Sequence, residues 1–164
     1  MPDIFTKAKR SAVMAAIRSR GNRATELRMV ALLRAHGIHG WRRQQQLRIL
    51  ESGTRNGKGR RAPAGSLRTP HSAFRVSTDF VFRRERVAVF IDGCFWHCCP
   101  KHGTMPAGNW AFWKAKLSRN VERDRRVTGL LRKAGWKVLR IWEHDLAAKH
   151  WPRVAGRVAR ALGR

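Results

Sequence analysis

The sequence predicts an α/β domain in which a mixed central sheet is flanked by helices. Short segments rich in Val, Ile and Phe indicate strands, and longer segments with apolar residues at every third or fourth position indicate helices. The two kinds of segment follow one another along the chain, which favours a sheet with helices packed on it. The chain has 164 residues, of which 43% are apolar, so we expect a single folded domain over residues 1–164.

Two helices are expected in the N-terminal part of the chain. Residues 11–20 form a short basic helix, and a second helix begins after Asn22 and ends near His36, because Gly37 is a plausible stop. The apolar face of the second helix is predicted to consist of Leu27, Val30, Ala31 and Leu33.

Strands and a basic insertion follow. Residues 46–50 indicate a short strand, and residues 78–82 and 86–91 indicate a hairpin whose second strand is almost continuously apolar and therefore central. Residues 52–71 hold four Gly, two Pro and five Lys or Arg but no acid, which predicts a flexible basic insertion. This insertion either clamps DNA or is a tolerated surface loop.

The C-terminal part of the chain is predicted as helix, strand and helix. Residues 109–134 form the longest helix, which ends at Gly135, residues 137–142 form a further buried strand, and a last helix begins near Pro152. The apolar positions of the long helix are Trp110, Trp113, Leu117, Val121, Thr128 and Leu131, and those of the last helix are Val154, Val158 and Leu162.

The charge of the chain points to nucleic acid. Lys and Arg number 36 against 10 Asp and Glu, which gives a formal net charge of +26. Such an excess repels itself unless a polyanion is present, and basic side chains gain affinity by releasing counterions from phosphates. An Arg-rich soluble protein is the alternative. The sequence has no apolar run of about 18 residues and no secretory signal, so we expect a cytoplasmic, nucleoid-associated protein without membrane contact.

The cysteines and nearby histidines predict a zinc site. Cys94, Cys98 and Cys99 lie within six positions, a spacing that suits a metal better than a disulfide framework. Zinc takes four thiolate or imidazole ligands. Cys94, Cys99 and His102 supply three, and His144 at the end of the last predicted strand is the best-placed fourth. Cys98 competes with Cys99, and a buried cysteine cluster without metal is the alternative.

Acidic residues are few, so candidates for catalysis are few. Asp79 lies within an apolar predicted strand, where an unpaired carboxylate is costly unless it holds a metal or an ion pair. Asp92 ends the neighbouring strand, and the two carboxylates are expected to converge and hold Mg²⁺. His97 follows closely and suits proton transfer. Glu26 is a further candidate, although an acid in a first helical turn usually serves the helix dipole.

Other acids fit simpler roles. Glu122 and Asp124 lie among arginines on the long predicted helix, where solvated or structural ion pairs are expected.

Five motifs in the second half of the chain carry a family resemblance. They are Asp92-Gly93-Cys94-Phe95-Trp96-His97, Cys99-Pro100-Lys101-His102, Asn109 with Phe112-Trp113-Lys114 and Lys116, Asn120 with Arg123-Asp124, and residues 135–144. Together they closely resemble the very short patch repair (Vsr) DNA mismatch endonucleases. Residues 10–14 and 25–33 are also similar, so the resemblance covers most of the chain outside residues 52–71.

The resemblance implies a restriction-endonuclease-like fold and Mg²⁺-dependent nicking of one strand of duplex DNA beside a T·G mismatch. Asp79 matches the family's metal-binding Asp, and His97 matches its catalytic His. Asp92 stands at a second active-site position, and Glu26 matches an acidic residue near the site. The family's zinc ligands fall on Cys94, Cys99, His102 and His144.

The resemblance also implies DNA contacts. Phe95, Trp96 and Trp113 match aromatic residues that insert into the base stack, which is easiest at a mismatch, where pairing and stacking are already weak. Lys116 and Asn120 are taken as further DNA-binding residues. Ordinary core packing is the alternative for the three rings, above all for Trp113 on its apolar helix face.

The chain departs from the family in two places. Val76-Ser77-Thr78 precede Asp79 where the family commonly has Pro-Gly-x-Pro, and the basic insertion lies just upstream. The function expected is that of a monomeric Mg²⁺-dependent mismatch-nicking endonuclease with structural zinc; repair-protein partners are not identifiable. The alternatives are a related nicking endonuclease without mismatch specificity, and a catalytically inactive zinc-stabilised DNA-binding module.

Overall fold

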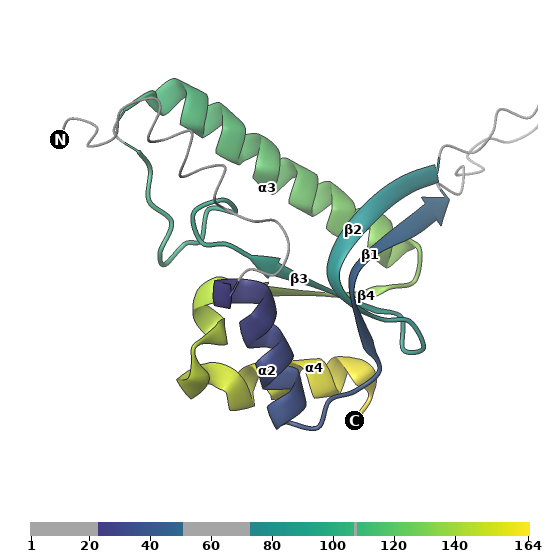
Figure 1. Ribbon diagram of the computed structural model, residues 1–164. Helices are drawn as coiled ribbons and strands as arrows, with labels where there is room; N and C mark the ends of the chain where they lie inside the picture. Colours follow the sequence, from purple (N-terminus) through teal and green to yellow (C-terminus); the bar gives the residue numbers. More distant parts are fainter. Residues whose placement is uncertain (1–22, 51–72, 107) are drawn as a thin grey trace, which may run out of the picture.

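The computed structural model describes residues 23–50, 73–106 and 108–164 (Figure 1). The predicted helix 11–20, the residue Asn22 and the basic insertion 52–71 lie outside the described residues. The elements are η1 (Arg23–Leu27), α2 (Arg28–Ala35), β1 (Trp41–Leu50), β2 (Ala73–Phe82), β3 (Val87–Asp92), α3 (Trp110–Lys133), β4 (Lys137–Trp142), η2 (Glu143–Leu146), η3 (Ala148–His150) and α4 (Trp151–Leu162).

The four strands form one mixed sheet in the order β1-β2-β3-β4. The β1–β2 and β2–β3 pairs are antiparallel, whereas β3 and β4 are parallel. Helix α3 covers one face of the sheet, and α2 and α4 lie together on the other (Figure 1). The predicted α/β class, with a mixed sheet flanked by helices, is therefore confirmed.

The core has two parts, one on each face of the sheet. Between the sheet and α2 and α4, fully buried side chains include Phe80, Phe82 and Val89. Between the sheet and α3 lie Val81 and Ala88, among others. Strand β3 contributes to both parts and is buried at five of its six positions, so the prediction that it is central is confirmed.

The apolar face predicted for the second helix is partly wrong. Its buried side chains are Met29, Leu32 and Leu33, whereas Leu27 is 39% exposed and Ala31 is exposed. Met29, Leu32 and Leu33 share one face of α2, because they are three and four residues apart. Leu27 belongs to η1, a π-helical turn that precedes α2. Gly37 adopts a φ of 64° just after the helix, and the predicted stop is confirmed.

The long helix and the last strand are less buried than predicted. Only Leu117 and Leu131 of α3 are buried, and Trp110 is 54% exposed. In β4 only Ile141 is buried, because β4 is an edge strand with no partner strand beyond it among the described residues. Among those residues, no helix combines the length and the apolar character needed to cross a membrane.

We expect Phe80→Ala to lower the free energy of unfolding by about 3–5 kcal/mol, because it empties a fully buried site in the core. Phe80 also packs edge-on against Trp41, with ring centroids 5.6 Å apart. Urea unfolding at constant m-value measures the change. Phe112→Ala is the matched control, since Phe112 is 58% exposed and its loss should cost less than about 0.5 kcal/mol. Equal effects would contradict this core.

Candidate active site and metal centre

Asp79 lies where β2 separates from β3. The β2–β3 ladder runs from Phe82 paired with Val87 to Phe80 paired with Val89, and then ends. At this point a side chain replaces the backbone as hydrogen-bond acceptor. Asp79 Oδ2 accepts a hydrogen bond of 2.7 Å from the backbone N–H of Ile91. The Asp79 carboxylate therefore lies at the point where β2 and β3 separate.

The surroundings of Asp79 disfavour its negative charge. Burial raises the pKa of Asp79 above its ordinary value of 3.8, and the charges of Asp92 and Glu26 act in the same direction. The Ile91 N–H and the His97 imidazole oppose the shift. Asp79 has no salt bridge among the described residues. A cation bound close to it would favour its ionised form.

His97 is held by a carboxylate from α3. Its Nδ1 hydrogen-bonds to Oδ2 of Asp124 and lies 3.7 Å from Oδ1 of Asp92. The His97 backbone N–H donates to Gly93 O at 3.1 Å, within a tight turn that follows β3. An imidazole oriented through one nitrogen can present the other to a reacting group.

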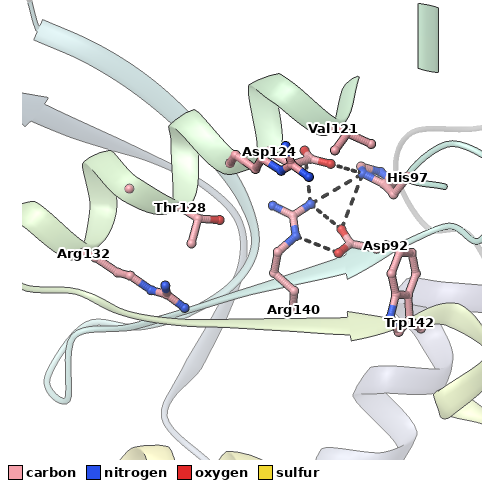
Figure 2. A pocket seen from close by; sticks show the side chains of 10 residues that line it. Asp92, His97, Val121, Asp124, Thr128, Arg132, Arg140 and Trp142 are labelled. Atoms are coloured by element: carbon pink, nitrogen blue, oxygen red, sulfur yellow. Dashed lines mark hydrogen bonds and ion pairs between the residues drawn. The ribbon is translucent and has the colours of Figure 1, made fainter. Parts of the chain in front are cut away.

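Arg140 of β4 joins the same network (Figure 2). Its Nε and Nη2 donate to the two oxygens of Asp92 at 2.7 and 2.5 Å, and Nη2 also lies 3.1 Å from Asp124. Although burial opposes the charge, the ion pairs with Asp92 and Asp124 raise the pKa of Arg140. Arg140 is therefore a permanent cation that neutralises part of the acidic cluster.

These side chains line a cavity of about 390 Å³ between β2 and α3. Asp79, Asp92, His97, Asp124 and Arg140 all contribute to its wall. The Asp92–Arg140–Asp124 network also borders a second cavity of about 430 Å³ on the β4 side, shown in Figure 2. The sequence prediction that Asp79, Asp92 and His97 converge agrees with this arrangement, and Glu26 is close enough for its charge to act on Asp79.

A second cluster forms at the ends of β3 and β4. Because the two strands are parallel and Asp92 pairs with Trp142, the loops that follow them leave the sheet at the same edge. One loop carries Cys94 and Cys99, whose turn is closed by a 2.9 Å hydrogen bond from Cys99 N to Cys94 O. The other carries Glu143, whose carboxylate accepts the Cys94 N–H at 3.0 Å.

The four predicted zinc ligands meet in this cluster. The ligand atoms of Cys94, Cys99, His102 and His144 all lie within 4.8 Å of one another. His144 Nδ1 is 3.1 Å from the Cys94 sulfur and 3.7 Å from the Cys99 sulfur, and His102 Nδ1 is 3.9 Å from the latter. Tetrahedral zinc with ordinary bond lengths would place S and N about 3.6 Å apart. The cluster therefore has the size that a four-coordinate metal requires.

Neighbouring groups also suit a metal. The other nitrogen of His144 lies 3.5 Å from the buried Asp145 carboxylate, the arrangement that usually orients a metal-bound histidine. Burial raises the pKa of the Cys94 thiol to about 11, so a cation is needed to stabilise its thiolate. Cys98 is exposed and has a left-handed φ of 53°. It is not part of the cluster, which favours Cys99 as the ligand.

The aromatic residues form a cluster beside the site rather than part of the core. Phe95 contacts Trp96 and Trp113 edge-on, with ring centroids 4.9 and 5.4 Å apart. All three rings are partly exposed. Lys116 Nζ lies 5.2 Å from the ring centroid of Trp96 and 5.3 Å from that of Trp113. The Asn120 amide donates to the Trp96 carbonyl at 3.1 Å, so Asn120 holds the turn that carries these rings.

Sequence reasoning missed two members of the site. Asp124 was expected in a solvated or structural ion pair, and its partners are His97 and Arg140; its neighbour Glu122 is exposed as expected. The signal for Asp124 was its place in the Asn120-Arg123-Asp124 motif. Arg140 lies within the motif of residues 135–144. One arginine among so many does not stand out, however, until the β3–β4 pairing places it beside Asp92.

Comparison with known proteins identifies the family. Residues 66–102 match the family described as DNA mismatch endonuclease Vsr. The chain is 32% identical to DNA mismatch endonuclease Vsr of Escherichia coli (strain K12) over 153 residues, which cover 91% of this chain and 78% of that protein. The chain belongs to the Vsr family. The resemblance that its motifs predicted is confirmed.

Other Vsr-like relatives are named as nicking enzymes. Type II nicking enzyme V.NaeI of Lentzea aerocolonigenes is 59% identical over 71 residues, or 43% of each chain. Type II nicking enzyme V.NmeAIP of Neisseria meningitidis serogroup A is 33% identical over 151 residues, or 91% of this chain and 87% of the relative. The match thus spans less than half of V.NaeI but most of V.NmeAIP. Vsr membership implies a restriction-endonuclease-like fold.

We expect Asp79→Asn to raise the melting temperature at pH 7 in the absence of divalent metal. The folded state binds the Asp79 proton more tightly than the unfolded state, so the wild type loses stability as the pH rises through the raised pKa. Asn keeps an acceptor for the Ile91 N–H but carries no charge. The gain should shrink on acidification and vanish below about pH 3.8, where the carboxyl is protonated in both states.

Thermal unfolding measured at several pH values checks this expectation. Glu122→Gln removes an exposed carboxylate of α3 and should change the melting temperature little at any pH. A variant Asp79→Asn that is less stable than the wild type at pH 7 would contradict the electrostatic account.

Proposed function

We propose that this chain is a DNA endonuclease that nicks one strand of duplex DNA beside a T·G mismatch, with Mg²⁺ as cofactor. The observation that carries the proposal is the cavity in which Asp79 lies with an imidazole fixed by Asp124. Mismatch specificity is inferred from Vsr membership. Duplex DNA as the substrate fits the net charge of +26.

The proposed chemistry divides among several side chains in and beside the cavity. Bound Mg²⁺ would polarise the scissile phosphoryl group. Asp79 is the proposed Mg²⁺ ligand, because its carboxylate faces the cavity and lacks a cation of its own among the described residues. His97 accepts a proton from the attacking water, since Asp124 holds the ring and stabilises its protonated form.

Asp92 has a different proposed role from Asp79. Both of its oxygens are occupied by Arg140, so we assign it to positioning Arg140 and His97 rather than to direct metal binding. Glu26 forms an ion pair with Arg43 at 3.3 Å and is buried. We propose that its charge helps to attract the metal to Asp79.

We further propose that the Cys94, Cys99, His102 and His144 cluster binds structural zinc. The separations of the ligand atoms fit a tetrahedral ion, and the carboxylate of Asp145 supports His144. Such a site would tie the loop after β3 to the loop after β4 and so contribute directly to folding stability.

Phe95, Trp96 and Trp113 are proposed to wedge into the base stack at the mismatch, with Lys116 and Asn120 supporting them. The partial exposure of the three rings and their place outside both core clusters favour this role over core packing. A monomeric state and a nucleoid-associated cytoplasmic location stay predictions, as does the single-domain organisation.

The alternative of a catalytically inactive module is less favoured. What favours an active site instead is that β2 is one strand from Ala73 to Phe82 and that Asp79 lines the same cavity as His97. The other alternative, nicking without mismatch specificity, differs only in the substrate and is separated by comparing matched and T·G duplexes.

We expect Asp79→Ala and His97→Ala each to lower the rate of nicking of a T·G duplex in Mg²⁺ by at least about 10²-fold, because they remove the metal ligand and the proton acceptor. Asp124→Asn should lower the rate by about 10–100-fold, by analogy with other orienting partners. A gel assay with one labelled strand measures the rate.

Glu122→Gln, two residues away on the same helix, is the matched control and should retain the wild-type rate. If both Asp79→Ala and His97→Ala nick as fast as the wild type, the proposed catalytic site is wrong.

Cys99→Ser should release zinc and lower the melting temperature by about 10 °C, on the order of 3–5 kcal/mol, because it removes one metal ligand. Cys98→Ser provides an adjacent control and should keep both zinc and stability, since Cys98 is exposed and outside the cluster. Zinc content by atomic absorption and thermal unfolding are the measurements. Equal zinc content in the two variants would exclude Cys99 as a ligand.

A further inference from the structure

Strands β1 and β2 extend beyond the rest of the sheet as a two-stranded arm. After β3 leaves β2, the β1–β2 ladder continues from Gln45 paired with Thr78 to Leu50 paired with Ala73 (Figure 1). A proline in the stretch before Asp79 would interrupt such a ladder, because proline has no N–H to donate. Here Val76, Ser77 and Thr78 stand in that stretch, and the ladder is continuous.

The two faces of the arm differ in chemistry. Leu47, Ile49 and Val76 are buried against α3. Side chains alternate along a strand, so the residues between them point the other way. Two of these are Arg48 and Arg75, both of which are exposed.

Arg48 and Arg75 are direct cross-strand partners. Like charges placed opposite each other in an antiparallel pair destabilise it. Neither arginine forms a salt bridge with any residue in the described part of the chain. Ion pairs within the described part of the chain therefore do not account for this pair, whereas a bound polyanion would convert the repulsion into attraction.

One member of the pair, Arg75, borders the candidate active site. Arg75 lines the same cavity as Asp79, and Arg123 of α3, also exposed, lines it too. The cavity that holds the three aspartates is thus also lined by exposed arginines from β2 and α3. Phosphates on either side of the scissile one would meet positive charge there.

We propose that Arg48 and Arg75 bind backbone phosphates of duplex DNA next to the phosphate that the site acts on. The arm is then a DNA-binding surface separate from the aromatic cluster of Phe95, Trp96 and Trp113. This inference rests on the proposed function for its substrate. Contacts to phosphates carry no sequence information, so the arm strengthens binding to matched and T·G duplexes alike.

The test compares two double variants that remove the same charge. Arg48→Gln with Arg75→Gln removes the arm pair. Arg34→Gln with Arg160→Gln removes two exposed arginines of α2 and α4, on the other face of the sheet from α3. DNA affinity is measured by fluorescence anisotropy with matched and T·G duplexes between 50 and 200 mM salt, without added divalent metal.

The arm variant should lose about two units of slope in log affinity against log salt, because each phosphate contact contributes about 0.9. Over this salt range the affinity ratio of wild type to arm variant should then change by about twelvefold, equally for both duplexes. The control variant should keep the wild-type slope. An unchanged slope in the arm variant, or an equal loss in the control, overturns the proposal.

A second measurement needs no DNA. At low salt, Arg48→Gln alone should raise the melting temperature by about 1–3 °C, because it relieves the repulsion from Arg75. A fall in melting temperature would mean that the pair stabilises the fold, and would overturn the proposal. If the wild type binds DNA but nicks no duplex, the proposed function fails while the binding result still decides the role of the arm.

Discussion

The parallel pairing of β3 with β4 is the constraint on which both candidate sites depend. It places Asp92 beside Trp142, so the loops that follow the two strands leave the sheet together. The cluster of Cys94, Cys99, His102 and His144 is built from these loops. The same pairing places Phe90 beside Arg140. Asp92 is two residues after Phe90, so its side chain lies on the same face of the sheet, where the Arg140 guanidinium reaches it. An antiparallel β4 would have sent its loop to the opposite edge, and neither cluster would form.

Ten acids in a chain of 164 residues are distributed unevenly. Asp79, Asp92 and Asp124 line one cavity, and Glu26 acts on it through its charge. In so basic a molecule this concentration of carboxylates is costly for folding, and Arg140 offsets only part of it. Burial is the main cause of the raised pKa of Asp79, and the charges of Asp92 and Glu26 add to it. A cation bound beside Asp79 would favour its ionised form.

Much of the fold followed from local patterns, because strongly apolar strands and glycine stops act over short distances. The hairpin before Asp92 and the helix that ends before Gly135 are of this kind. The extension of β1 back to Trp41 was missed, because Arg and Gln side chains on an edge strand need no apolar alternation. The buried face of α2 was misassigned, because Met29 and Leu32 are apolar as well and the sequence offers two overlapping apolar faces.

The residues of the candidate site also differ in how far the sequence could predict them. Residues close in sequence to apolar strands, such as Asp79 and His97, stood out by their chemistry. Asp124 and Arg140 did not, because their partners lie 27 and 48 residues away along the chain. Only tertiary structure shows that a helix carboxylate and a strand arginine meet the same imidazole. The proposed zinc ligands were easier to find, since three of the four lie within nine positions.

The turn after β3 has a further consequence, since it carries both the thiols of the metal cluster and the imidazole of the cavity. His97 lies between Cys94 and Cys99, and the hydrogen bond that closes this turn joins the two cysteines. On the proposed assignments, loss of the structural ion would loosen the proton acceptor at the same moment. Phe95 and Trp96 lie in the same turn. Two of the three rings proposed to enter the base stack would therefore lose their positions together with His97.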